Sequence, residues 1–146
     1  MKIEFGSVRV EHISRILEIE NQSFQVPWSR DGFRDLISNP SFTSIGIFID
    51  GILVGYVFYY LVMDELHVMN VAVDPMHRKK GLGTTLLDKV HQEGRKYAIK
   101  VAYLEVRETN ETAQKLYEKM GYQKQGRRIG YYANKEDALL MFKKLT

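Results

Sequence analysis

Residues 71–84 read VAVDPMHRKKGLGT, a β-rich run followed by a basic turn with two glycines and the beginning of a long helical pattern. The first N–H groups of a helix have no partner inside the helix, and the helix dipole adds partial positive charge there. Gly81 and Gly83 let a ligand approach the backbone closely, and the basic residues 78–80 raise the local positive potential. We therefore predict a phosphate or pyrophosphate site at this turn.

The turn differs from the two best-known phosphate-binding motifs. The Walker pattern G-x-x-x-x-G-K-[ST] is missing, and a single G-x-G after a basic triplet is not the dinucleotide fingerprint. A solvated basic loop in front of a helix would have the same sequence. The turn alone therefore leaves that structural interpretation open, and it disfavours dinucleotide binding.

The chain before the turn is predicted to form two helices and an antiparallel meander. β-rich runs at 43–49 and 52–62 flank Asp50-Gly51, a dipeptide that favours the tight turn of a hairpin, and a further strand is expected at 66–73. Ahead of them we predict a strand at 3–9, an amphipathic helix from Ile13 to about Glu20, and a second helix that Ser29 caps and Asn39-Pro40 ends.

The chain after the turn alternates helices and strands. A long helix is expected to bury Leu82, Leu86, Leu87, Val90 and Tyr97 and to carry His91 on its surface. A strand at 101–106, a helix capped by Asn110 and ended by Gly121, and strands at 122–128 and 138–143 follow. The order β-α-α-β-β-β-α-β-α-β-β predicts an α/β fold of mixed α+β character, with helices on the faces of one twisted mixed sheet.

Length and composition limit the class of protein. The 146 residues, 45% of them hydrophobic, are typical of one globular domain spanning 1–146. The absence of cysteine excludes a disulfide scaffold, thiolate metal sites and a cysteine nucleophile. No apolar run is long enough for a membrane span and no signal peptide is visible, so we expect a cytoplasmic protein. A net charge of +3 permits an anionic partner without requiring one.

Two motifs together resemble the GNAT superfamily of acetyl-CoA-dependent N-acetyltransferases, over essentially the whole chain. They are R-x-x-G-x-G from Arg78 to Gly83 and N-x-x-A-x-x-L-Y-x-x-x-G-Y from Asn110 to Tyr122. The resemblance implies the GNAT fold, a seven-stranded sheet with about four helices, and acetyl-CoA as cofactor. The coenzyme contacts that it implies come from Val71, Ala72, Val73, Arg78, Lys79, Lys80, Gly81, Leu82, Gly83, Thr84, Asn110 and Tyr117.

Further residues look like the RimI-type branch of that superfamily, whose members acetylate protein N-termini, including the alanine of a ribosomal protein. These residues are LEVR at 104–107, Arg127-Arg128, Tyr131-Tyr132 and EDA at 136–138. GYYA at 130–133 also looks like archaeal protein N-terminal acetyltransferases. The resemblance thus implies a protein or peptide N-terminus as acceptor. The segment after Tyr132 is shorter than in bacterial members, a departure that bears on acceptor specificity.

Glu105 and Tyr117 are the candidate catalytic residues. Glu105 lies in an otherwise apolar strand, where a carboxylate is costly to bury unless it is paired, although simple alternation would turn it to solvent beside Tyr103 and Arg107. Tyr117 lies on an amphipathic helix, where a core aromatic is the plain interpretation. The resemblance makes Glu105 the general base and Tyr117 the general acid, with Asn110 both a helix cap and a coenzyme contact.

The resemblance also implies an acceptor site. It places the loop of Phe24, Pro27 and Trp28 over the acceptor peptide, opposite Tyr131 and Tyr132, although an apolar loop of this kind can simply pack on the core. No pair of the four histidines has the spacing of metal ligands, so we expect no metal site.

Two other functions stay open at this stage. A GNAT enzyme for a small amine would share every coenzyme residue. A non-catalytic module that binds anions or nucleic acid through the basic clusters ranks last, because no exposed aromatic–basic RNA motif is present. We expect direct acetyl transfer with no covalent enzyme intermediate, no membrane partner and no direct contact with nucleic acid.

Overall fold

The computed structural model describes residues 2–24 and 27–146. Its strands are β1 (Ile3–Gly6), β2 (Thr43–Ile49), β3 (Ile52–Val62), β4 (Glu65–Val73), β5 (Val101–Arg107), β6 (Gln123–Arg128) and β7 (Ala138–Lys144). Its helices are α1 (Ile13–Ser23), α2 (Arg30–Ser38), α3 (Leu82–Lys96) and α4 (Glu111–Lys119), with short 3₁₀ turns at Val10–His12 and Pro75–His77. The predicted order of elements is confirmed.

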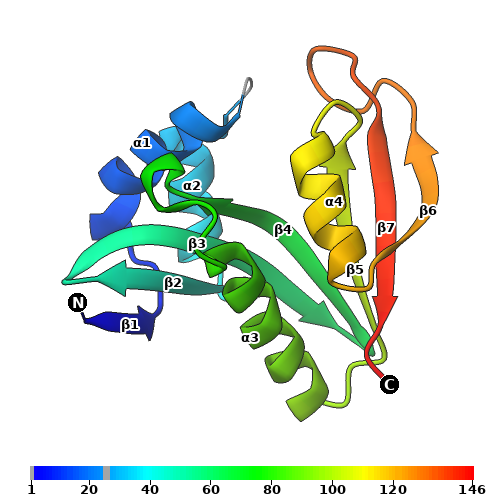
Figure 1. Cartoon of the computed structure of the whole chain (residues 1–146), viewed down its shortest axis with the longest axis horizontal. Coiled ribbons are helices and arrows are strands. Elements are labelled where there is room, and N and C mark those ends of the chain that lie inside the picture. The colour runs from blue at the N-terminus through cyan, green and yellow to red at the C-terminus, as the bar shows by residue number, and fades with distance from the viewer. Residues whose placement is uncertain (1, 25–26) are drawn as a thin grey trace.

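One mixed sheet runs through the molecule in the order β1-β2-β3-β4-β5-β7-β6 (Figure 1). Strands β1 to β4 form an antiparallel meander, β4 and β5 pair in parallel, and β5, β7 and β6 are antiparallel. The hairpin turn has positive φ at Asp50 (50°) and Gly51 (84°), as its dipeptide predicts.

Helices cover the two faces of the sheet unequally. The apolar sides of α1 and α2 pack on one face of the β2–β4 half, around Ile16, Phe33, Tyr56 and Phe58. Helices α3 and α4 pack on the other face, where a larger core joins Leu86 and Tyr117 to β4, β5 and β7 (Figure 1). Strand β5 buries Ala102, Leu104 and Val106 on this second face, while its alternate residues stay half-exposed on the first. The α1–α2 layer therefore leaves the β5–β7 half open.

The sheet opens in its middle, between β4 and β5. Their parallel ladder runs only from Glu65↔Val101 to Val68↔Leu104, and a bulge at Met69 bends β4 at that point. Beyond Leu104 the two strands diverge, each keeping its partner on the outer side (Figure 1). This opening lies between the two helical layers and positions the site described below.

Four details of the sequence prediction are wrong. The first strand ends at Gly6 rather than Arg9, and α1 runs to Ser23 rather than about Glu20. His91 is buried because it lies on the apolar side of α3 and its Nε2 meets the Tyr122 hydroxyl at 2.7 Å. Tyr97 is exposed because α3 ends one residue before it. Among the described residues, no helix has the length and apolarity to cross a membrane.

Candidate functional site

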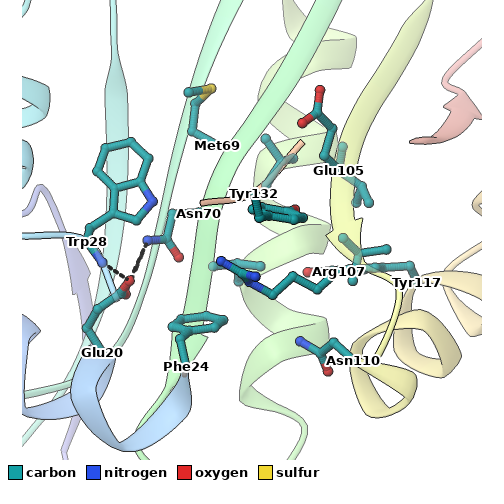
Figure 2. Close-up of a pocket in the computed structure, with 14 residues that line it drawn as sticks. Glu20, Phe24, Trp28, Met69, Asn70, Glu105, Arg107, Asn110, Tyr117 and Tyr132 are labelled. Atoms are coloured by element: carbon teal, nitrogen blue, oxygen red, sulfur yellow. Dashed lines mark hydrogen bonds between the residues drawn. The ribbon is translucent and has the colours of Figure 1, made fainter. Parts of the chain in front are cut away.

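The opening between β4 and β5 is a pocket lined by α1, β4, β5, α4 and the segments that connect helices and strands around them (Figure 2). Its lining residues are Glu20, Phe24, Trp28, Val68, Met69, Asn70, Val71, Leu104, Glu105, Val106, Arg107, Asn110, Tyr117 and Tyr132. The predicted residues Phe24, Trp28, Val71, Glu105, Asn110, Tyr117 and Tyr132 are thus brought together from distant parts of the chain. Glu20 and Asn70 were not singled out from the sequence, and Arg107 was noted only as part of the LEVR run and as a neighbour of Glu105 on its strand.

Glu105 sits where the parallel ladder has just ended. Side chains alternate along β5 as predicted, so Glu105 shares one face of the strand with Tyr103 and Arg107. At Glu105 this face opens into the pocket rather than into bulk solvent (Figure 2). The side chain is 31% exposed, and its Oε1 lies 3.4 Å from Nε of Arg128 on β6. A half-exposed carboxylate at the mouth of a pocket can accept a proton from a basic group that enters.

Tyr117 reaches the same pocket from the opposite face of the sheet. It is buried in the core between α4 and β5, its ring 6.0 Å from that of Tyr122. Burial raises the pKa of the Tyr117 phenol, so the hydroxyl stays protonated at neutral pH and can act as a proton donor. Tyr117 is therefore a core aromatic, as its place on an amphipathic helix predicts, and it also lines the pocket, whereas its role as a general acid stays a prediction.

The segment between β6 and β7 is fixed over the pocket by Arg107. The Arg107 guanidinium lies 3.8 Å from the Tyr132 ring centroid, and its Nη1 donates to Asn134 Oδ1 and Glu136 Oε1, each at 3.1 Å. Glu136 also accepts from the Thr109 backbone N–H at 2.8 Å. Desolvation, and next the Glu105 carboxylate, raise the pKa of Tyr132 to about 12, so this hydroxyl also stays protonated.

Tyr131 lies at the outer rim, packed edge-to-face on Tyr132 at 5.2 Å and 51% exposed. The Glu105 carboxylate is the main cause that raises the pKa of Tyr131. The two tyrosines predicted to meet the acceptor are therefore adjacent, and both face Glu105.

The opposite wall comes from α1 and the loop before α2. Trp28 packs against Phe33, with ring centroids 5.7 Å apart, and Phe24 faces the opening from the end of α1 (Figure 2). Pro27 is half-buried but does not line the pocket, and Gln25 and Val26 lie outside the described residues. The loop thus packs on the core and lines the pocket at once.

A buried carboxylate, Glu20, holds this wall. It accepts hydrogen bonds from the Trp28 backbone N–H (3.1 Å) and the Asn70 amide (3.2 Å), both drawn in Figure 2, and also from the Tyr56 hydroxyl (2.6 Å). Burial raises the pKa of Glu20 against the effect of these bonds. One sequence signal could have found it: Glu20 continues the apolar side of α1 at helical spacing after Ile13 and Ile16.

The basic turn lies beside the pocket, at the N-terminus of α3. Gly81 is the N-cap residue in the left-handed region (φ 76°), and within the described chain no group bonds the N–H groups of Leu82, Gly83 and Thr84. Such a helix N-terminus is suited to bind an anion. Gly83 has a second role, because an added Cβ would lie 3.3 Å from Leu116 of α4.

The three basic residues of the turn differ in their surroundings. Arg78 is engaged with the protein: Nε donates to the Val73 carbonyl at 3.3 Å and Nη2 to the Ser23 hydroxyl at 3.0 Å. Lys79 and Lys80 are exposed and form no ion pair with another described residue. We therefore assign the free positive charge of the turn to the two lysines.

The remaining predicted coenzyme contacts split between the pocket and the core. Asn110 caps α4, its Oδ1 accepting from the Ala113 N–H at 3.1 Å, and it also lines the pocket. Val71 lines the pocket, whereas Ala72 packs against the α1–α2 layer and Val73 and Leu82 against the α3–α4 core. The side chain of Ala72 is therefore buried in the fold, whereas those of Val73 and Leu82 pack on the core and stay partly exposed.

A second hollow of about 660 Å³ continues from the pocket along the open face of β5 and β7. It shares Trp28, Val68, Met69, Leu104, Glu105 and Tyr132 with the first pocket. Glu105 therefore stands at the junction of the two spaces. In the part of the chain that the structure describes, no group of three or more His, Cys, Asp or Glu side chains is arranged to hold a metal ion.

The arrangement suits a transfer between two molecules that enter from different sides. One has an anionic part at the α3 turn and a reactive end near Tyr117. The other enters along the open face and brings a basic group to Glu105. A carboxylate and a phenol on either side of the opening can accept one proton and donate another.

Comparison with known proteins agrees with this geometry. The model of the acetyltransferase (GNAT) family matches residues 13–122. A protein of Bacillus subtilis strain 168, provisionally named a ribosomal protein bS18-alanine N-acetyltransferase, is 39% identical over 97% of this chain and 95% of its own length.

Two solved structures share the fold. The ribosomal-protein-S18-alanine N-acetyltransferase of Escherichia coli superposes with a TM-score of 0.89 and 27% identity, over 99% of this chain and 95% of its own. The structure of Arabidopsis thaliana NAA60 in complex with acetyl-CoA has a TM-score of 0.85 and 18% identity, over 98% of both chains. At that identity the second comparison bears on the fold alone.

Proposed function

Because the chain belongs to the acetyltransferase (GNAT) family and is an N-acetyltransferase, we propose that it transfers the acetyl group of acetyl-CoA to the α-amino group of a protein. The leading acceptor is the N-terminal alanine of ribosomal protein bS18, after the names of the relatives from Bacillus subtilis and Escherichia coli. The reaction then takes place in the cytoplasm, where that acceptor is synthesised.

One observation carries the choice of a polypeptide acceptor. The space on the acceptor side of Glu105 is an open groove that leads away along β5 and β7, between Trp28 and the Tyr131–Tyr132 pair. A small amine needs only the junction at Glu105, whereas an N-terminus needs a path for the rest of its chain. The groove volume of about 660 Å³ lies in the range of sites that hold more than a small amine.

The chain also has the features that acetyl-CoA requires. The free N–H groups of the first turn of α3, together with Lys79 and Lys80, suit the pyrophosphate. The divergence of β4 and β5 leaves the inner edge of β4 at Val71 and Val73 without a strand partner, where an extended pantetheine arm can bind. When bound, acetyl-CoA supplies the activated acetyl thioester.

The protein then supplies two proton transfers. Glu105 accepts a proton from the acceptor α-ammonium, directly or through water, so that the neutral amine attacks the acetyl carbonyl. Tyr117 donates its proton to the departing sulfur, and the second proton, lost from the nitrogen as the amide forms, returns through water to the Tyr117 phenolate. The acetyl group passes directly between the two substrates, since the chain has no cysteine to carry it.

The test is an acetyl-transfer assay with three classes of acceptor: peptides with a free N-terminal alanine, the same peptides with a blocked N-terminus and an internal lysine, and free polyamines. We expect turnover of the first class at least tenfold above the other two. Equal turnover of polyamines and free N-termini would contradict a protein acceptor and favour a small-amine enzyme.

A further inference from the structure

Three rings are stacked side by side on the floor of the groove, one from each of three neighbouring strands. Tyr60 on β3 is the cross-strand partner of His67 on β4, which in turn is the partner of Tyr103 on β5. The Tyr60 and His67 centroids are 4.8 Å apart at an interplanar angle of 6°, and those of His67 and Tyr103 are 5.3 Å apart at 22°. All three residues line the groove and are half-buried.

A carboxylate stands at the end of this stack. Glu65 lies two residues before His67 on the same face of β4, and its Oε1 is 2.8 Å from His67 Nε2. The Glu65 side chain lines the groove and is 43% exposed, and its second oxygen forms no hydrogen bond with another described residue. Cross-strand stacking by itself can stabilise the sheet where the parallel ladder lies. That role needs neither the exposure of the rings nor a carboxylate beside them.

The stack lies along the groove from Glu105, the proposed base, at a distance of two residues on β5. Tyr103 precedes Glu105 by two residues on the same face of β5, which is about 7 Å along a strand. An extended peptide advances about 3.3 Å per residue, so an acceptor whose α-amine is at Glu105 brings its second or third residue over Tyr103.

The chemistry of this floor favours a cation. Aromatic faces attract Lys and Arg side chains, and the open oxygen of Glu65 adds a negative charge within reach. The groove has one guanidinium of its own, Arg128, which is held away from Glu65 by Glu105 at 3.4 Å and by the Tyr131 ring at 5.3 Å. No Lys or Arg side chain of the described residues forms an ion pair with Glu65, whose partner is His67, so a cation that enters the groove can approach this carboxylate.

We propose that Tyr60, His67, Tyr103 and Glu65 form a subsite for a basic side chain at the second or third residue of the acceptor. This assignment rests on the proposed function, because it requires a peptide N-terminus at Glu105. It makes Glu65 a specificity-determining residue that does not contact the reacting atoms.

The test compares kcat/KM for three alanine-first peptides whose second and third residues are lysine, glutamine or phenylalanine. We expect the wild-type protein to favour the lysine peptide over the glutamine peptide by roughly two- to fivefold, the range of an exposed cation–aromatic contact. Glu65→Gln is expected to reduce that preference to near one by slowing the lysine peptide, with the glutamine peptide unchanged. Glu118→Gln, an exposed carboxylate on α4 outside the groove, is the matched control and should keep the preference.

A second pair of variants tests the aromatic floor. Tyr103→Leu is expected to reduce the lysine preference, and Tyr103→Phe, which keeps the ring, is expected to retain it.

Two results would overturn the subsite: a wild-type protein without a lysine preference, or a lysine preference that survives Glu65→Gln. In either case, acetylation of the glutamine peptide would still support the proposed function. Equal use of the phenylalanine and lysine peptides would make the stack an apolar shelf and also overturn it. Acetylation of none of the peptides would contradict the proposed function, and the subsite with it.

Discussion

Several single residues serve the fold and the site at the same time. Asn110 caps α4 and lines the pocket, Tyr117 packs in the core and lines the pocket, and Gly83 lies in the first turn of α3 and lets α4 pack against it. A structural interpretation of such a residue therefore does not compete with a functional one. Substitutions that separate the two roles must keep the shape and remove only the chemical group.

Glu105→Gln keeps the shape and removes the base. We expect kcat to fall by about 10²–10⁴-fold while acetyl-CoA still binds. The deficit should shrink as the pH rises, because more of the acceptor amine is then already neutral. Steady-state kinetics from pH 6.5 to pH 9 measure both effects. Arg128→Gln is the control, since it breaks the same ion pair but leaves the carboxylate, and a loss of equal size in that variant would contradict the role of Glu105.

Tyr117→Phe keeps the ring in the core and removes only the hydroxyl. We expect turnover to fall with little change in stability, because this hydroxyl has no hydrogen-bond partner within the described structure. Tyr122→Phe reverses the pattern. Its hydroxyl bonds His91 in the core and does not line the pocket, so activity should persist while stability falls by about 1 kcal/mol. Normal kcat in Tyr117→Phe as well would contradict the role of this hydroxyl as the proton donor.

At the scale of elements, the turn and the first turn of α3 act as one unit. Arg78 ties the turn to the end of β4 and to α1, so the direction of the free N–H groups depends on three elements. The predicted basic triplet is thus one structural arginine and two lysines available to a ligand.

Acetyl-CoA should raise the melting temperature of the wild-type protein, because a ligand that binds only the folded state stabilises it. Gly83→Val should abolish this shift by filling the space beside the α3 backbone. It should also lower the melting temperature without ligand, since an added Cβ meets Leu116 at 3.3 Å. Gly126→Val is the control, because an added Cβ there meets nothing within 4 Å. A full acetyl-CoA shift in Gly83→Val would remove the turn from the site.

At the scale of the whole molecule, the two halves of the sheet are joined by one short parallel ladder, and the site exists because that ladder ends early. The core of α3 and α4 holds the halves together on one face. It includes the buried pair His91 and Tyr122, which links α3 to the chain just after α4. The stability of this core should depend on pH.

Burial, and then the charges of Lys143 and Arg95, lower the pKa of His91 to about 4 from its ordinary 6.5. A lowered pKa means that the folded state holds neutral histidine, so the stabilisation is complete above pH 6.5 and is lost as the pH falls towards 4. Between pH 7 and pH 5 we expect this residue to cost about 2 kcal/mol of unfolding free energy. Urea unfolding of the wild type and of His91→Gln at both pH values measures the difference. An identical pH dependence in the two proteins would show that His91 does not titrate as its burial implies.

Local order was readable from the chain because it depends on near neighbours. The Asp50-Gly51 hairpin, the Ser29 and Asn110 caps and the Gly121 helix end follow from turn geometry and capping, and each is found where it was predicted. The family was predicted from the resemblance of two motifs, at 78–83 and 110–122, to the GNAT superfamily, and the family comparison confirms it.

Long-range contacts were decided only by the tertiary structure. Strand periodicity predicted which residues share a face with Glu105. That face lines a pocket because the pairing of β4 with β5 ends at Leu104, which the sequence did not predict. The Glu20 network and the Tyr60–His67–Tyr103 stack depend on the register between elements far apart in the chain. Helical periodicity predicted His91 on the surface of its helix, and only the tertiary structure, in which it contacts Tyr122, shows that it is buried. Short-range sterics determine elements and turns, whereas packing between elements determines which polar groups are enclosed and which meet a substrate.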